Sequence, residues 1–98
     1  MNKIEHLFAC LSEECGEAIH AIGKVQRFGL DDMWPEVGLT NSEQVQKELL
    51  DIVAVAELLR ECGVLPITEK ASEKIQAKKD KVKRMMEYAQ DRGTLTEE

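Results

Sequence analysis

The segment that decides the fold is LLDIVAVAELL, residues 49–59. It is apolar on almost every side of a helix, although IVAVA alone would also suit a strand. The length of the segment and its flanks, KELLD and AELLREC, favour a helix over residues 42–62. Such a helix is expected to be the buried spine of the fold.

Turn-forming residues divide the chain into three helical segments. They gather in FGLDDMWPEVGLTNS (28–42) and in CGVLPIT (62–68). Apolar residues that recur every three or four positions predict a first helix over residues 2–26, and a thinner stripe predicts a third over residues 68–91. The stripe of the first helix consists of Ile4, Phe8, Leu11, Cys15, Ile19, Ile22 and Val25. The pattern predicts an all-α fold, an antiparallel helical bundle of three main helices.

The expected helix ends follow from known capping patterns. Gly29 stands where a glycine commonly ends a helix. The second helix would begin with a capping box of Thr40 with Glu43, or of Asn41 with Gln44.

The length of 98 residues predicts a single domain, residues 1–93, followed by a flexible C-terminal tail, residues 94–98. Hydrophobic residues make up 43% and charged residues 33%, which fits a folded protein rather than a disordered one. A chain this short buries a modest fraction of its surface, so we expect oligomerisation to complete the core.

The net charge of −6 is unevenly distributed. Residues 1–67 hold 5 basic against 12 acidic side chains, whereas residues 68–92 hold 8 against 5. An acidic protein has no general attraction for nucleic acid or anionic membranes, and neither is an expected partner. An acidic region together with a basic helix suits the binding of a metal-bound polyphosphate. The alternative is that the basic helix is simply exposed to solvent and binds nothing.

The cysteines and the first residues indicate a cytoplasmic location. Cys10, Cys15 and Cys62 are odd in number and form no CxxC pair, so they are interpreted as buried thiols in a reducing compartment. The start, MNKIEHLFACLSEE, lacks an apolar signal-peptide core, and no stretch approaches the roughly 20 apolar residues of a membrane span.

Two acidic pairs are the candidate chemistry of the chain. Glu14 with Glu17, and Glu48 with Asp51, are each three residues apart, which puts both members on one face of a helix. The second pair interrupts an apolar helix, where an ionised carboxylate needs a positive partner. If the two helices pack antiparallel, the four acids can converge to bind Mg²⁺ or Mn²⁺. The alternative is that the first pair is solvated and the second pairs with lysine or arginine.

LSEECGEAIHAIGKVQRFGL (11–30) followed by NSEQVQKELLDIVAVAELL (41–59) resembles the MazG-like branch of the all-α nucleoside triphosphate pyrophosphohydrolases. The resemblance covers about half of the chain and rests on ExxE and ExxD motifs in the same order. It implies that the four acids bind Mg²⁺ and are catalytic, while water attacks the α-phosphate of a (d)NTP or modified nucleotide to release pyrophosphate. It also implies a homodimer or homotetramer that acts in nucleotide-pool control or housecleaning.

The resemblance further suggests substrate-binding residues outside the acids. Lys74 and Lys78 fit the basic motif of the family loosely, because the arginine usual there is missing. Lys24 and Arg27 are the alternative, and Trp34 would either stack on a base or cover a subunit interface.

Two expectations concern neighbours of the acids, and two rival functions stay open. Glu13 and His20 are expected to be ordinary surface residues.

The same fold would also suit a catalytically idle nucleotide sensor or a helical protein-interaction module. Mg²⁺ would stabilise a four-carboxylate site but would not affect such a module.

Overall fold

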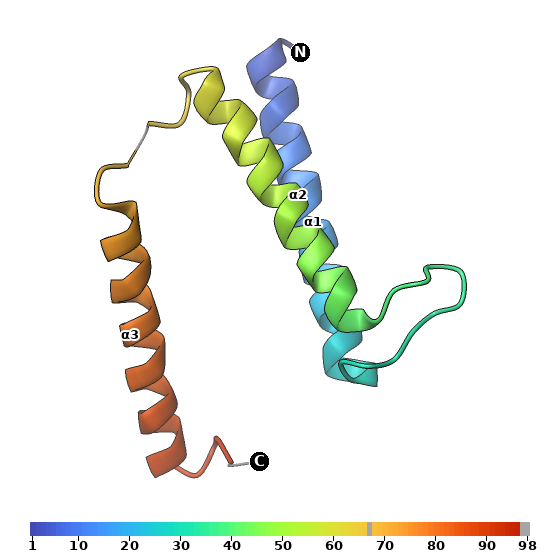
Figure 1. The fold of residues 1–98 in the computed structure, drawn as a ribbon, viewed down its shortest axis with the longest axis vertical. Coiled ribbons are helices and arrows are strands. Elements are labelled where there is room, and N and C mark those ends of the chain that lie inside the picture. The colour runs from blue at the N-terminus through green and yellow to red at the C-terminus, as the bar shows by residue number, and fades with distance from the viewer. Residues whose placement is uncertain (67, 97–98) are drawn as a thin grey trace. The chain divides into compact units, whose positions relative to one another are not determined.

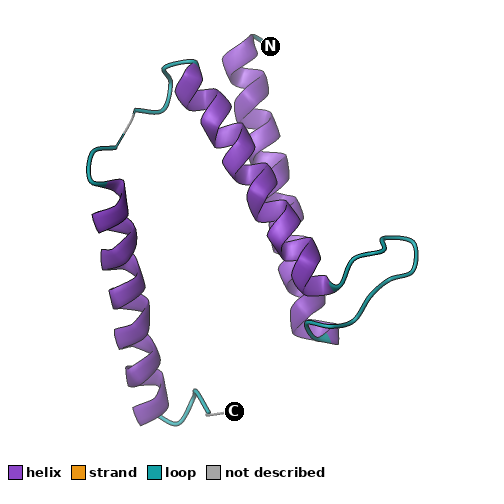
Figure 2. Cartoon of the chain, in the orientation of Figure 1, coloured by secondary structure: helices purple, strands orange, loops and turns teal. Residues whose placement is uncertain are grey.

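The computed structural model describes residues 1–66 and 68–96, in which three helices and no strand are found. The helices are α1 (Lys3–Phe28), α2 (Asn41–Glu61) and α3 (Ala71–Asp91), joined by loops (Figure 2). The predicted all-α fold is confirmed, and each predicted helix end lies within three residues of the observed one.

The chain divides into two compact units, the first of which is Met1–Pro66. In this unit α1 and α2 lie side by side and run in opposite directions, connected by the long loop between them (Figure 1). This helical hairpin is the part of the fold that positions the acidic residues.

Side-chain caps fix where the two helices of the hairpin begin. Asn2 accepts a hydrogen bond from the backbone N–H of Glu5 at 2.8 Å. Thr40 accepts one from the N–H of Glu43, whose carboxylate in turn accepts one from the N–H of Thr40. The predicted capping box of Thr40 with Glu43 is therefore confirmed.

Both ends of the loop between α1 and α2 are tied together at one place. Gly29 ends α1 with a φ of 89°, a conformation that favours glycine. Its carbonyl accepts a hydrogen bond of 2.9 Å from the side-chain Nδ2 of Asn41, which is buried. The backbone N–H of Asn41 donates to the carbonyl of Asp32 at 2.9 Å, and that of Ser42 donates to the carbonyl of Leu30 at 3.0 Å.

The hairpin buries a different face from the predicted one. Among the described residues, the buried apolar side chains are those of Ala18, Ala21 and Leu59, and the two small ones let α1 lie close to α2. The predicted stripe of α1 is largely exposed at Ile4, Phe8, Ile19 and Ile22. The predicted apolar spine of α2 is likewise exposed within this chain, at Leu49, Leu50, Val53 and Leu58.

The prediction of a buried spine is wrong for the single chain, because a hairpin of two helices covers only one face of each.

The interpretation of the cysteines also needs correction. All three are free thiols, but Cys15 is exposed, while Cys10 and Cys62 are half-buried.

The second unit contains α3, which begins three residues later than predicted. Lys70 precedes it with a φ of 58° and provides no side-chain cap. After the helix, the N–H groups of Thr94 and Leu95 donate to the carbonyl of Ala89, at 3.0 and 3.1 Å. Residue 67 of the predicted second turn region and residues 97–98 of the predicted tail lie outside the described residues.

Among the residues that the structure describes, no helix combines the length and the apolar character that crossing a membrane would require.

We predict that Asn41→Ala lowers the free energy of unfolding by about 1–3 kcal/mol, because it leaves the carbonyl of Gly29 without its partner. Urea unfolding followed by circular dichroism measures this. Gln46→Ala, at an exposed position of the same helix, is the control. Equal stability of the two variants would contradict the role given to Asn41.

Candidate metal centre

Antiparallel packing of α1 and α2 brings the four predicted acids to one place. Glu14, Glu17, Glu48 and Asp51 each offer one carboxylate oxygen, and these oxygens all lie within 4.8 Å of one another. Each helix contributes two residues one turn apart, so the cluster depends on the hairpin. We call these four residues the acid cluster.

The acid cluster is unequally exposed to solvent. Glu48 is buried, with 4% of its surface exposed, Glu14 and Asp51 are half-buried, and Glu17 is exposed. One oxygen each of Glu14 and Glu48, Oε2 in both cases, is buried and has no hydrogen-bond partner among the described residues. A buried carboxylate oxygen without a partner is costly, and a ligand that binds these two atoms would remove that cost.

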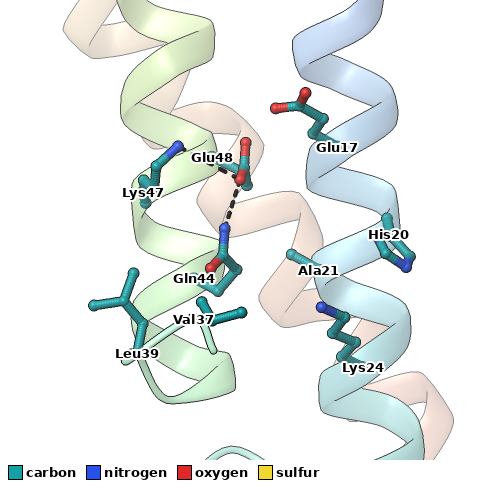
Figure 3. A pocket seen from close by; sticks show the side chains of 9 residues that line it. All are labelled: Glu17, His20, Ala21, Lys24, Val37, Leu39, Gln44, Lys47 and Glu48. Carbon is teal, nitrogen blue, oxygen red and sulfur yellow. Dashed lines mark hydrogen bonds and ion pairs between the residues drawn. The ribbon is translucent and has the colours of Figure 1, made fainter. Parts of the chain in front are cut away.

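Two neighbours on α2 contact the cluster directly. Gln44 donates a hydrogen bond from Nε2 to Oε1 of Glu48 at 2.7 Å (Figure 3). Lys47 Nζ lies 2.8 Å from Oδ2 of Asp51 and 3.7 Å from Oε1 of Glu48. The predicted alternative of a lysine partner is thus present in part. One ammonium group against four carboxylates still leaves an excess of negative charge.

The other acids of the cluster raise the pKa of Glu17. The pKa of Glu17 is raised, first because its carboxyl group can share a hydrogen bond with that of Glu48, and then because of the charge of Glu14. The pKa of Lys47 is also raised, chiefly by its hydrogen bond with Asp51. Both shifts show that the cluster favours added positive charge.

The donor set fits a hard divalent cation. It consists of carboxylate oxygens alone, which Mg²⁺ and Mn²⁺ prefer over nitrogen or sulfur ligands. The two unpartnered oxygens supply ligand atoms that no described side chain uses. The acid cluster is therefore able to hold such an ion.

A cavity of about 520 Å³ adjoins the acid cluster. Figure 3 shows Glu17 and Glu48 on opposite walls, contributed by α1 and α2. The other residues that line it are His20, Ala21, Lys24, Val37, Leu39, Gln44 and Lys47. Glu13 is exposed as predicted, and His20 is exposed too, but it borders this cavity rather than plain surface.

Gln44 and Lys47 were not among the predicted site residues. Their spacing contained the signal, because each lies four residues before an acid of the cluster, Glu48 and Asp51 respectively. Side chains at that spacing meet on one face of a helix.

The predicted substrate-binding residues of the first unit occupy different positions. Lys24 lines the cavity, and its Nζ lies 5.3 Å from the ring centroid of Trp34. Arg27 does not line the cavity and lies over the ring of Phe28 at 5.2 Å. Phe28 and Trp34 meet edge to face with their centroids 6.3 Å apart. Trp34 does not line the cavity either, but it contacts Lys24, which does.

Lys74 and Lys78 lie four residues apart on α3, in the second unit. Their part in substrate binding stays a prediction.

Comparison of the chain with protein-family models, with curated proteins and with solved structures found no match.

We predict that Glu17→Gln stabilises the protein at neutral pH when a chelator keeps divalent cations away. The raised pKa of Glu17 means that the folded state binds its proton more tightly than the unfolded state does. The stability that the parent protein gains from binding this proton is present below the usual glutamate pKa and is lost as the pH rises through the raised pKa of Glu17. Glu17→Gln should therefore be more stable than the parent protein at neutral pH but not at acidic pH.

Thermal unfolding at low ionic strength, at neutral and at acidic pH, measures this difference. Glu57→Gln, at an exposed position of α2, is the control. If Glu17→Gln and Glu57→Gln change stability alike at neutral pH, the cluster does not repel Glu17.

Proposed function

We propose that this chain is a Mg²⁺-dependent nucleoside triphosphate diphosphatase of the MazG-like all-α type. It would hydrolyse a (d)NTP or a modified nucleotide to a monophosphate and pyrophosphate. The observation that carries the proposal is the convergence of four carboxylates, among which the buried Glu48 has one oxygen without a hydrogen-bond partner. A protein-interaction module has no need for an uncompensated carboxylate at that position.

In this proposal the acid cluster holds the ion. Its four carboxylates would hold Mg²⁺, which when bound would supply activation of water and compensation of the negative charge on phosphate oxygens. Glu17 is exposed and lines the cavity, which supports its choice among the glutamates as the group that would accept the proton of the attacking water. Glu48 is held from one side by Gln44, which leaves its second oxygen for the ion.

The adjoining cavity is the proposed substrate site. Lys24 contributes a positive charge at its wall, opposite in sign to a phosphate chain. Trp34 does not line the cavity, but it contacts Lys24 and would offer an aromatic ring on which a base can stack beside it. Lys74 and Lys78 are further candidates for binding the leaving pyrophosphate.

We further propose that the hairpin assembles into a homodimer or homotetramer, which completes a helical bundle. The supporting observation is the exposed apolar stripe of α1, where Ile4, Phe8 and Ile22 are exposed by about two-fifths and Ile19 by 70%. Exposed apolar stripes of this kind mark protein–protein contacts. A second copy would cover the faces of α1 and α2 that one chain leaves open.

Glu48→Gln should abolish pyrophosphate release, with a loss of at least about 100-fold, because it removes a charged ligand while keeping the shape of the side chain. The assay is a panel of canonical and damaged (d)NTPs with Mg²⁺, read as pyrophosphate and not orthophosphate. Circular dichroism checks that the variant folds. Glu57→Gln serves as the control.

Full activity of Glu48→Gln would contradict the mechanism. Tight nucleotide binding by the parent protein without turnover would indicate a sensor of the same fold instead. If neither nucleotide nor Mg²⁺ changes the melting temperature, the chain is better explained as an interaction module.

Ile19→Lys should shift the protein from an oligomer toward a monomer, because a charge in the centre of the apolar stripe must be desolvated on assembly. Light scattering coupled to size-exclusion chromatography measures the mass. Glu13→Lys introduces the same side chain at an exposed position outside the stripe and should leave the oligomer intact. A monomeric parent protein would contradict the proposed assembly.

A further inference from the structure

Lys47 is the one basic side chain among the described residues that forms an ion pair. Its ammonium group lies 2.8 Å from Asp51 Oδ2 and 3.7 Å from Glu48 Oε1, so it contacts two of the four acids. The side chain also lines the cavity and is about half exposed, at 53% (Figure 3). Lys47 therefore stands where the acid cluster meets the proposed substrate site.

The contacts of Lys47 are of a kind that another cation can replace. A half-exposed ion pair contributes little to stability, and the lysine stem is long and flexible. Glu48 does not depend on Lys47 for its orientation, because Gln44 already donates a shorter hydrogen bond to the same oxygen. Movement of Lys47 would thus cost few contacts and would leave the cluster in place.

A divalent cation and the ammonium group compete for the same carboxylates. Two like-signed cations a few ångströms apart repel, and the repulsion doubles when one of them is divalent. Release of Lys47 from Asp51 would relieve it. The adjoining cavity is where an anionic phosphate chain would attract the released ammonium group.

We propose that Lys47 is a displaceable counter-cation of the acid cluster. Without a divalent cation it pairs with Asp51 and lies near Glu48, and so offsets part of their negative charge. When Mg²⁺ occupies the cluster, Lys47 turns into the cavity and donates hydrogen bonds to phosphate oxygens of the nucleotide. This inference rests on the proposed function and adds to it a residue that links metal binding to substrate binding.

The first test is Mg²⁺ binding without nucleotide, measured by isothermal titration calorimetry on the full chain. Lys47→Met keeps the length of the stem and removes the charge. It should bind Mg²⁺ about tenfold more tightly than the parent protein, because its competitor is gone. Lys47→Arg keeps the charge and should bind as the parent protein does. Lys83→Met, at an exposed position of α3, is the control for loss of a lysine.

The second test is steady-state hydrolysis at saturating Mg²⁺. Lys47→Met should raise the KM for the triphosphate about tenfold while changing kcat less, because the ammonium group binds the substrate in its ground state. Lys47→Gln is the second variant for both tests should Lys47→Met not fold by circular dichroism.

The outcomes separate this inference from the proposed function. If the parent protein binds Mg²⁺ and releases pyrophosphate but Lys47→Met binds Mg²⁺ no more tightly, the counter-cation role is overturned and the enzyme remains. Tighter Mg²⁺ binding with an unchanged KM overturns the contact with phosphate. If the parent protein does not bind Mg²⁺, both the proposed function and this inference are overturned.

Discussion

The burial of the Glu48 carboxylate against α1 is the constraint on which the rest of the hairpin depends. An ionised group with 4% of its surface exposed needs partners, yet only one of its two oxygens has one among the described residues. Glu14 and Glu17 approach it from α1 and add charge of the same sign. Packing of the two helices thus concentrates negative charge instead of dispersing it.

Small residues and a tied loop make this close approach possible. Ala18 and Ala21 are buried on α1, and their short side chains let α2 come near at the level of the acids. The hydrogen bond from Asn41 to the carbonyl of Gly29 fixes where α2 begins relative to where α1 ends. Since the acids occupy set positions along each helix, this connection also sets the register at which the two pairs meet.

The sequence was sufficient for the features that depend on local patterns. Apolar spacing predicted three helices, Thr40 and Glu43 predicted the start of α2, and the two acidic pairs predicted which carboxylates meet. It did not predict which faces are buried, because an apolar stripe does not say whether its own chain or a second copy covers it. Ile19 belongs to the predicted core stripe and is nevertheless 70% exposed. The contacts of Gln44 and Lys47 were also missed, since several conformations of a long side chain suit the same helix position.

Two features of the acid cluster reduce the repulsion between its carboxylates. A proton can be shared between Glu17 and Glu48, which explains the raised pKa of Glu17. The ammonium group of Lys47 supplies a second positive charge, but from the exposed rim and to only two of the acids. The ammonium group forms no hydrogen bond with the buried Oε2 atoms of Glu14 and Glu48, which have no partner in the described part of the chain. A small divalent cation held by the four carboxylates would offset the charge of all of them together, and this is the physical reason for preferring a metal site to a set of surface ion pairs.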